Sequence, residues 1–182
     1  MKLALVSDLH GQSICLRNLK EVIKLNNPDG IIISGDISSG DTDYIDILFE
    51  IFRAGLLEAF IICGNADVGD CQRMIDQSEY SINQKCKSFG KAKICGLCDH
   101  EEFLSSPGEI AGSIFVSHRP PVKSLIDKKL DNAPLIHISG HLHTREFTKQ
   151  YPSTKHIQIP TLQSGKYALL DVDSGDVEFL TI

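Results

Sequence analysis

The sequence has 182 residues, of which 42% are hydrophobic and 23% are charged, and its formal net charge is −6 at pH 7. A chain of this length can bury about 70% of its unfolded surface in one core, so we expect residues 1–182 to form a single domain. The acidic balance, without a dense run of Lys or Arg, argues against long nucleic acid as the main partner.

Targeting signals and cysteine spacing bear on the compartment. Met1-Lys2 leads directly into an apolar run, and no apolar stretch approaches membrane-spanning length. The six cysteines lie in apolar or loop contexts without the spacing of a disulfide framework, at positions 15, 63, 71, 86, 95 and 98. We therefore expect a cytoplasmic protein without a membrane partner, in which most cysteines are small core residues. The oligomeric state is left open.

The first third of the chain alternates short apolar runs with amphipathic segments. Ser13 is positioned to cap a helix that ends at 26–30, and Asp43 to cap a second helix that Gly55 closes. Apolar residues recur at helical spacing in both segments. With strands at 3–6, 31–33 and 60–62, the predicted order is β-α-β-α-β.

The middle of the chain predicts a shorter helix at 70–77, followed by two short strands at 87–89 and 92–96. A further strand at 114–116 precedes Pro120-Pro121, which should start a helix over 122–130 because Pro is accepted in a first helical turn. Another strand follows at 135–138.

The tail has strand patterns at 147–150, 156–159, 167–172 and 177–181, separated by turns, and we expect it to form a β meander. A βαβ-rich first part and an antiparallel last part predict an α/β fold. The expected architecture is a four-layer α-β-β-α sandwich of two mixed sheets with flanking helices.

Five of the apolar runs stop at a residue that can bind a metal ion. In open α/β sheets, ligands bind at the loops that follow the carboxyl ends of the strands, so these residues can converge although they are distant in sequence. The pattern indicates a metal-dependent hydrolytic site. The candidate ligands are Asp8, His10, Asp36, Asn65, His118, His141 and His143.

Spacing and residue type suggest how two ions could be held. Side chains two positions apart on an extended segment point the same way, so the pairs Asp8/His10 and His141/His143 can each chelate. Asp36 is the best candidate for a bridging ligand, because its carboxylate has two oxygens. Imidazole, carboxylate and amide donors without thiolate indicate Mn, Fe, Zn or Ni rather than Ca.

The ordered motifs resemble those of the calcineurin-like metallophosphoesterase family: Asp8-x-His10, Gly35-Asp36, Gly64-Asn65, His118 and Gly140-His141-x-His143. The stretch 164–171 also resembles the closing strands of small, single-domain prokaryotic members.

That resemblance implies one ion held by Asp8, His10, Asp36 and His143, and a second held by Asp36, Asn65, His118 and His141. It favours two Mn²⁺ ions, with a bridging hydroxide as the nucleophile for in-line hydrolysis of phosphate esters. It also implies catalytic roles for Asn65 and His118.

The sequence departs from the family pattern at Ala66, where many members have a His that is often assigned as the acid for the leaving group. Without that acid, esters with leaving groups of low pKa should be favoured. Protein serine/threonine phosphatases are disfavoured, because the Asp-Arg-Gly after Asp36 and the His-Glu after Asn65 are missing. Double-strand-break nucleases of the superfamily are disfavoured too, because they carry the His that Ala66 replaces here and are much longer chains.

Several other residues have two interpretations. Arg119 could bind a substrate phosphate by a bidentate contact or could be a solvated charge, and Asp67 could orient a catalytic group but more simply caps the next helix. Cys95-x-x-Cys98, with Cys86 and His100 nearby, could form a small zinc site, but the second pair of ligands is absent and we interpret these cysteines as structural. The remaining histidines, 137 and 156, are expected to be hydrogen-bonded or surface residues.

The sequence therefore predicts a metal-dependent phosphoesterase that acts on small phosphate esters, more readily on phosphodiesters than on monoesters. With little chain left over for a capping domain, its site should be shallow. The alternative is a non-catalytic protein-interaction scaffold that retains the metal-bound fold. A nucleic-acid exonuclease is a third interpretation, which the acidic charge opposes.

Overall fold

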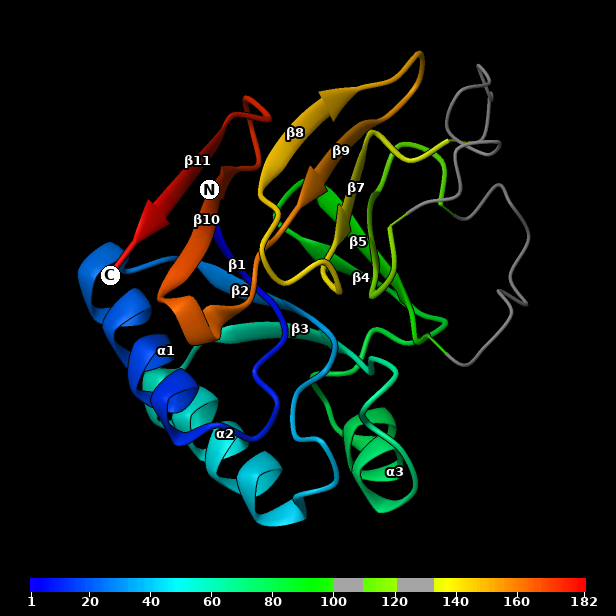
Figure 1. The fold of residues 1–182 in the computed structure, drawn as a ribbon. Coiled ribbons are helices and arrows are strands. Elements are labelled where there is room, and N and C mark those ends of the chain that lie inside the picture. The colour runs from blue at the N-terminus through cyan, green and yellow to red at the C-terminus, as the bar shows by residue number, and fades with distance from the viewer. Residues whose placement is uncertain (100–109, 121–132) are drawn as a thin grey trace.

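A computed structural model describes residues 1–99, 110–120 and 133–182. Two mixed sheets pack face to face, as predicted, and the described helices lie along the five-stranded sheet (Figure 1). The helix expected over 122–130, and His100, lie outside the described residues.

The first sheet has five strands in the order β11-β10-β1-β2-β3. Strands β1, β2 and β3 are parallel, whereas β10 is antiparallel to both β1 and β11. The bounds are β1 Lys2–Val6, β2 Gly30–Ser34, β3 Glu58–Ile62, β10 Lys166–Asp171 and β11 Val177–Thr181.

The second sheet has six strands in the order β4-β5-β6-β7-β9-β8. Its four inner strands are parallel, and the two edge strands run antiparallel to their neighbours. The bounds are β4 Cys86–Phe89, β5 Ala92–Leu97, β6 Ile114–Ser117, β7 Ile136–Ser139, β8 Phe147–Gln150 and β9 Lys155–Gln158.

The expected meander in the tail is wrong, although all four of its strands exist. Strands β8 and β9 join the second sheet, whereas β10 and β11 join the first. The chain crosses between the sheets through a short 3-10 turn, Leu162–Ser164, where the Leu162 N–H donates to Ser7 O at 2.9 Å. The Asn18 side chain donates to Leu162 O at 3.0 Å, so this turn is also attached to the first helix.

Three helices are described: α1 Ser13–Asn26, α2 Thr42–Gly55 and α3 Asp70–Gln77. Figure 1 shows α1 and α2 side by side along the five-stranded sheet, away from the six-stranded one. Both expected caps are wrong by one or two residues. Gln12 precedes α1 without a side-chain cap, and the Asp41 carboxylate accepts the Tyr44 N–H at the start of α2. None of the described helices is long and apolar enough to cross a membrane.

The central strands β1 and β2 are buried on both faces, which explains their nearly continuous apolar sequence. Residues 3–6 and 31–33 have no exposed surface. On one side of the sheet, α2 contributes Phe52, whose ring lies 5.1 Å from that of Tyr80. On the other side, residues of the second sheet such as Val116 and Ile138 complete the core.

The cysteines follow the prediction in part. Cys15, Cys63, Cys71 and Cys98 are buried free thiols, as expected for small core residues. Cys86 and Cys95, however, form a disulfide, although the cysteine spacing does not indicate a disulfide framework. The two residues stand opposite each other in the antiparallel β4–β5 ladder, which their spacing in the sequence does not reveal. Cys95 is therefore not available for the zinc site that we considered.

The two histidines of the second sheet are buried and hydrogen-bonded, as expected. His137 Nε2 lies 2.7 Å from Ser117 Oγ, and His156 Nε2 lies 2.8 Å from Ser139 Oγ. Burial lowers the pKa of His137 to about 3 and that of His156 to about 4. Both imidazoles are therefore neutral in the folded protein at neutral pH.

Acid should destabilise the fold through these histidines. The unfolded chain takes up a proton near pH 6.5, whereas folded His137 does not do so until about pH 3, so stability present above pH 6.5 is lost as the pH falls. From pH 7 to pH 5, this histidine alone should cost about 2 kcal/mol. Urea unfolding at both pH values should show a pH effect smaller by that amount in His137→Gln. An equal pH effect in both proteins would contradict the prediction.

Candidate metal centre

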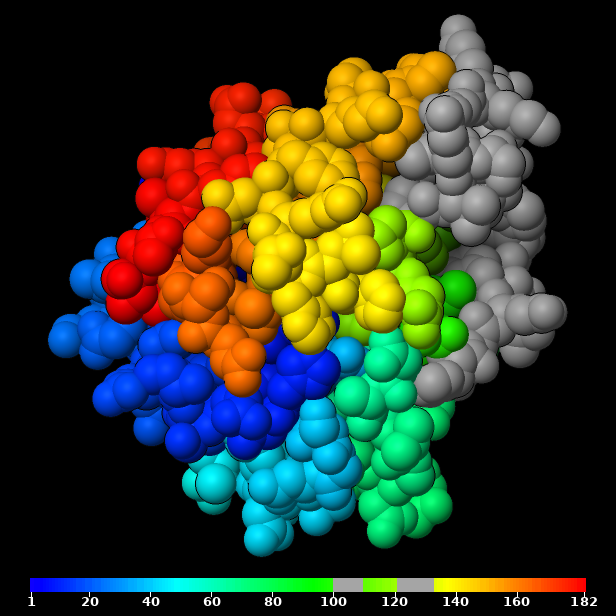
Figure 2. Space-filling model, in the orientation of Figure 1, coloured from blue at the N-terminus to red at the C-terminus, as the bar shows by residue number. Residues whose placement is uncertain are grey.

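All seven predicted ligands follow parallel strands, and the carboxyl ends of those strands meet at one edge of the two sheets. Figure 2 shows the blue segment after β1, the yellow segment after β7 and the cyan and green segments after β2 and β3 meeting on one face. The first sheet contributes Asp8, Asp36 and Asn65 through the loops after β1, β2 and β3. The second sheet contributes His118 and His141 through the loops after β6 and β7.

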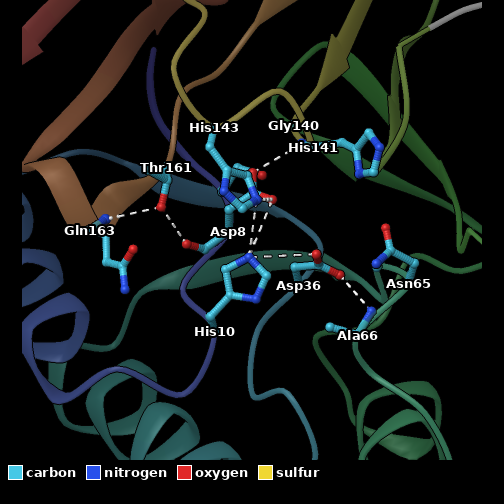
Figure 3. A network of polar contacts seen from close by, with 12 residues as sticks. Asp8, His10, Asp36, Asn65, Ala66, Gly140, His141, His143, Thr161 and Gln163 are labelled. Atoms are coloured by element: carbon cyan, nitrogen blue, oxygen red, sulfur yellow. Dashed lines mark hydrogen bonds and ion pairs between the residues drawn. The ribbon is translucent and has the colours of Figure 1, made fainter.

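Asp8, His10, Asp36 and His143 form a compact group whose possible ligand atoms all lie within 4.8 Å of one another. His143 Nε2 lies 3.2 Å from Asp8 Oδ1, and His10 Nε2 lies 3.6 Å from Asp36 Oδ2. In Figure 3 the rings of His10 and His143 approach the two carboxylates from opposite sides. The four donors are therefore arranged around one point.

The remaining candidates continue from the other side of Asp36. His118 Nε2 lies 3.3 Å from Asp36 Oδ2, and His141 Nδ1 lies 3.3 Å from His118 Nε2. Figure 3 shows Asn65 and His141 beyond Asp36 from His10. Asp36 thus stands between the two groups of candidate ligands.

A left-handed backbone is present at four of the seven candidates. The φ angles are 54° at Asp8, 51° at His10, 52° at Asp36 and 68° at His141. This conformation is unfavourable for residues with a side chain and persists where the surrounding structure imposes it, commonly at functional sites. The loops are therefore shaped to aim these side chains inward.

Two motif glycines are required because the loops approach each other closely. A Cβ atom on Gly64 would overlap the backbone N and Oδ1 of Asp36, and one on Gly140 would overlap Ser7 Oγ. The glycine before each ligand therefore permits loops from different strands to touch.

Asp8 gives a direct test of whether a cation fits this group. Its carboxylate is fully buried, and Oδ2 accepts the His141 N–H at 3.0 Å, whereas Oδ1 has no hydrogen bond among the described residues and faces His143 Nε2 at 3.2 Å. A buried carboxylate oxygen without a hydrogen bond is costly unless a positive charge lies beside it. Oδ1 belongs to the compact group with His10 and His143, so the donors present fit a divalent metal ion.

The pKa values of Asp36 and His118 move in opposite directions. Burial raises the pKa of Asp36, but hydrogen bonds from His118 and from the Ala66 N–H outweigh it and lower the pKa. Burial lowers the pKa of His118, but the hydrogen bond and the charge of Asp36 outweigh it and raise the pKa. The carboxylate is therefore held in the charged form that binds a cation.

Arg119 lies at the mouth of the site, where its guanidinium contacts three side chains. It forms an ion pair with Asp99 at 2.8 Å, approaches His141 Nε2 at 3.1 Å and donates to Asn65 Oδ1 at 3.4 Å. The Arg119 side chain is 55% exposed, whereas that of Asp99 is only 7% exposed. The buried carboxylate therefore fixes a guanidinium that remains open to solvent.

Asp67 has a role that the sequence did not indicate. The expected capping role is wrong, because α3 begins at Asp70 after Gly69. Its fully buried carboxylate instead accepts the N–H groups of Ile37, Ser38 and Gly64 at 2.9–3.0 Å. It therefore holds the loop that carries Asp36 against the loop that carries Asn65.

The comparisons with known proteins agree with this geometry. The sequence model of the calcineurin-like phosphoesterase family matches residues 1–148, so the chain belongs to this family of metal-dependent phosphoesterases. No curated protein matches the sequence.

Solved structures with the same fold include TT1561 of Thermus thermophilus, with a TM-score of 0.77 at 13% identity over 99% of this chain and 98% of that one. An archaeal phosphodiesterase has a TM-score of 0.63 at 15% identity, with both chains fully covered. The phosphoesterase YfcE from E. coli has a TM-score of 0.57 at 15% identity, again with both chains fully covered. At these identities the likeness establishes the fold.

Removing the charge of Asp67 should loosen the junction between the two loops. Asp67→Asn leaves an amide facing several N–H donors and should lower the free energy of unfolding by about 1–3 kcal/mol, because buried donors lose their acceptor. The matched control is Asp70→Asn, since Asp70 is an exposed acid paired with Arg73 on the surface of α3 and should matter by less than about 1 kcal/mol. Urea unfolding measures both, and equal effects would contradict the proposed role of Asp67.

Proposed function

We propose that the protein is a dinuclear metal-dependent phosphoesterase that hydrolyses small phosphodiesters in preference to monoesters. The observation that carries the proposal is the position of the buried Asp36 carboxylate between the two groups of candidate ligands. Two divalent cations about 3.5–4 Å apart would lower the pKa of a shared water toward 7 and stabilise charge on the attacked phosphoryl group.

The ligand sets that we propose follow the two groups. Asp8, His10 and His143 would hold one ion together with Asp36. The second ion would be held by four residues: Asp36, Asn65, His118 and His141. Asp36 is suited to both, because one oxygen accepts the Ala66 N–H at 2.7 Å and the other faces His10 and His118.

His118 is oriented by a backbone contact. Its Nδ1 lies 2.8 Å from Ser34 O, which fixes a proton on Nδ1, so Nε2, 3.3 Å from Asp36 Oδ2, is the nitrogen that would bind a metal ion in place of its proton. This arrangement supports His118 as a ligand that also shapes the catalytic centre. Asn65 supports the same centre from the loop after β3.

Arg119 is proposed to bind the substrate phosphate. Its ion pair with Asp99 uses Nε, and the two terminal nitrogens face His141 and Asn65 at the mouth of the site. A guanidinium held in this way can donate two parallel hydrogen bonds to phosphoryl oxygens. The other possibility, a solvated surface charge, does not account for these three contacts.

Other features of the proposal rest on sequence arguments. We propose Mn²⁺ as the native ion, with Fe, Zn or Ni as alternatives, a single domain over residues 1–182, and a shallow site open to diesters. The cytoplasmic location stays a prediction, since the Cys86–Cys95 disulfide removes the cysteine argument for a reducing compartment. The scaffold alternative is opposed by the completeness of the ligand set.

Activity should depend on Asp36 and on added metal. With Mn²⁺, the protein should hydrolyse a bis-aryl phosphodiester, and Asp36→Asn should lower kcat/KM by more than about 100-fold because a shared ligand loses its charge. Asp46→Asn, at an exposed acid of α2, is the matched control and should keep full activity. Absence of hydrolysis with Mn²⁺, Fe²⁺, Zn²⁺ and Ni²⁺ would favour the scaffold. Efficient turnover of monoesters with diesters untouched would contradict the substrate class.

The absence of a leaving-group acid at Ala66 should be visible in the dependence on leaving-group pKa. We expect the rate of the chemical step to fall steeply across a series of aryl esters as the leaving-group pKa rises, since a positioned acid is typically worth about 10²–10⁴-fold. Ala66→His keeps the backbone N–H that binds Asp36 and should flatten this dependence. A flat series in the unaltered protein would mean that another residue supplies the proton.

A further inference from the structure

A second cluster of metal-binding side chains lies behind the loop that carries Asn65. Cys63, Asp76 and Cys98 place their possible ligand atoms within 4.8 Å of one another. Cys63 follows β3, Cys98 follows β5, and Asp76 belongs to the last turn of α3. The two thiols have at most 1% of their surface exposed. None of these groups takes part in the proposed phosphoesterase chemistry.

The spacing of the three donors is close to that of a tetrahedral zinc site. Asp76 Oδ1 lies 3.9 Å from Cys63 Sγ and 3.7 Å from Cys98 Sγ. In a tetrahedral site with Zn–S of about 2.3 Å and Zn–O of about 2.0 Å, sulfur and oxygen ligands stand about 3.5 Å apart. The two sulfur–oxygen distances therefore exceed the tetrahedral value by only a few tenths of an ångström, and the two sulfurs lie within 4.8 Å of each other.

Neighbouring groups orient the donors in the manner of outer-shell partners in metal sites. Asn83 donates to Asp76 Oδ1 at 3.2 Å and accepts the Cys98 N–H at 2.9 Å, so it links the carboxylate to one of the cysteines. The Cys63 N–H donates to Cys98 Sγ at 2.9 Å, so a backbone group orients the second cysteine. The Gln72 carbonyl oxygen lies 3.9 Å from Cys63 Sγ.

We propose that Cys63, Cys98 and Asp76 bind one zinc ion, with water or the Gln72 carbonyl oxygen in the fourth position. Two thiolates select a soft or borderline ion, whereas the candidate catalytic centre offers only nitrogen and oxygen donors. The two sites therefore differ in the metal that they prefer. The ion would tie the end of β3 to α3 and to the segment after β5. The zinc ion would also steady the mouth of the candidate catalytic centre from two sides. Asn65 is two residues from Cys63, and Asp99, which pairs with Arg119, directly follows Cys98.

The proposal is tested by whether sulfur atoms coordinate the bound zinc. The full chain is produced in zinc-supplemented medium, so that a buried site can fill during folding, and its zinc is studied by elemental analysis and X-ray absorption. We expect sulfur neighbours at about 2.3 Å, which the candidate catalytic centre cannot supply because it lacks thiols. The sulfur signal should persist in Asp36→Asn, so that failure of the proposed catalytic centre and failure of this site are distinguishable.

Matched cysteine variants test whether the zinc-bound sulfur comes from Cys98. Cys98→Ser and Cys98→Ala should each lose the sulfur shell and about one zinc ion per chain, and Asp76→Asn should weaken zinc retention by at least about tenfold. Cys71→Ser removes a buried thiol of α3 outside the cluster and should change neither quantity. A zinc shell of nitrogen and oxygen alone in the unaltered protein would overturn the proposal, as would a sulfur shell that survives in folded Cys98→Ala. If neither Cys98 variant folds, the number of sulfur atoms bound to zinc in the unaltered protein tests the proposal. Two sulfurs per zinc ion, also present in Cys71→Ser, would support the site.

Discussion

Two buried carboxylates lie where the carboxyl ends of the parallel strands meet, and the site depends on positive charge that compensates them. Asp8 and Asp36 are almost fully buried at the same edge, where their negative charges repel each other in surroundings that screen charge poorly. His118 contacts Asp36 and His143 lies 3.2 Å from Asp8 Oδ1, yet this oxygen accepts no hydrogen bond in the described part of the chain. Divalent cations would remove the imbalance, which is why the geometry supports metal binding before any reaction is considered.

The same edge is maintained by contacts that carry no chemistry of their own. Asp67 gathers backbone N–H groups from two loops, and Thr161 Oγ1 donates to Asp8 O at 2.7 Å from the segment that crosses between the sheets. Gly64 and Gly140 allow the loops to touch. Contacts from other strands thus hold the candidate ligands in their left-handed backbone conformation. These tertiary contacts offset the free-energy cost of that conformation.

The loop after β3 separates two kinds of donor chemistry. On one side, Asn65 faces imidazoles and carboxylates, which suit Mn²⁺ and similar ions. On the other side, Cys63 faces Cys98 and Asp76 in the core. The proposed zinc site rests on the arrangement of Cys63, Cys98 and Asp76 in this structure and not on the family match.

The sequence by itself determined the local elements and the candidate ligands, because hydrophobic periodicity and a polar residue at a strand end are short-range patterns. The α3 bounds and the strands of the tail were predicted correctly in this way. Only the tertiary structure decided which sheet each tail strand joins, that Asp67 bridges two loops instead of capping a helix, and that Cys86 pairs with Cys95 while Cys98 meets Cys63. These outcomes depend on contacts between segments distant along the chain, and such contacts leave no periodic signal in the sequence.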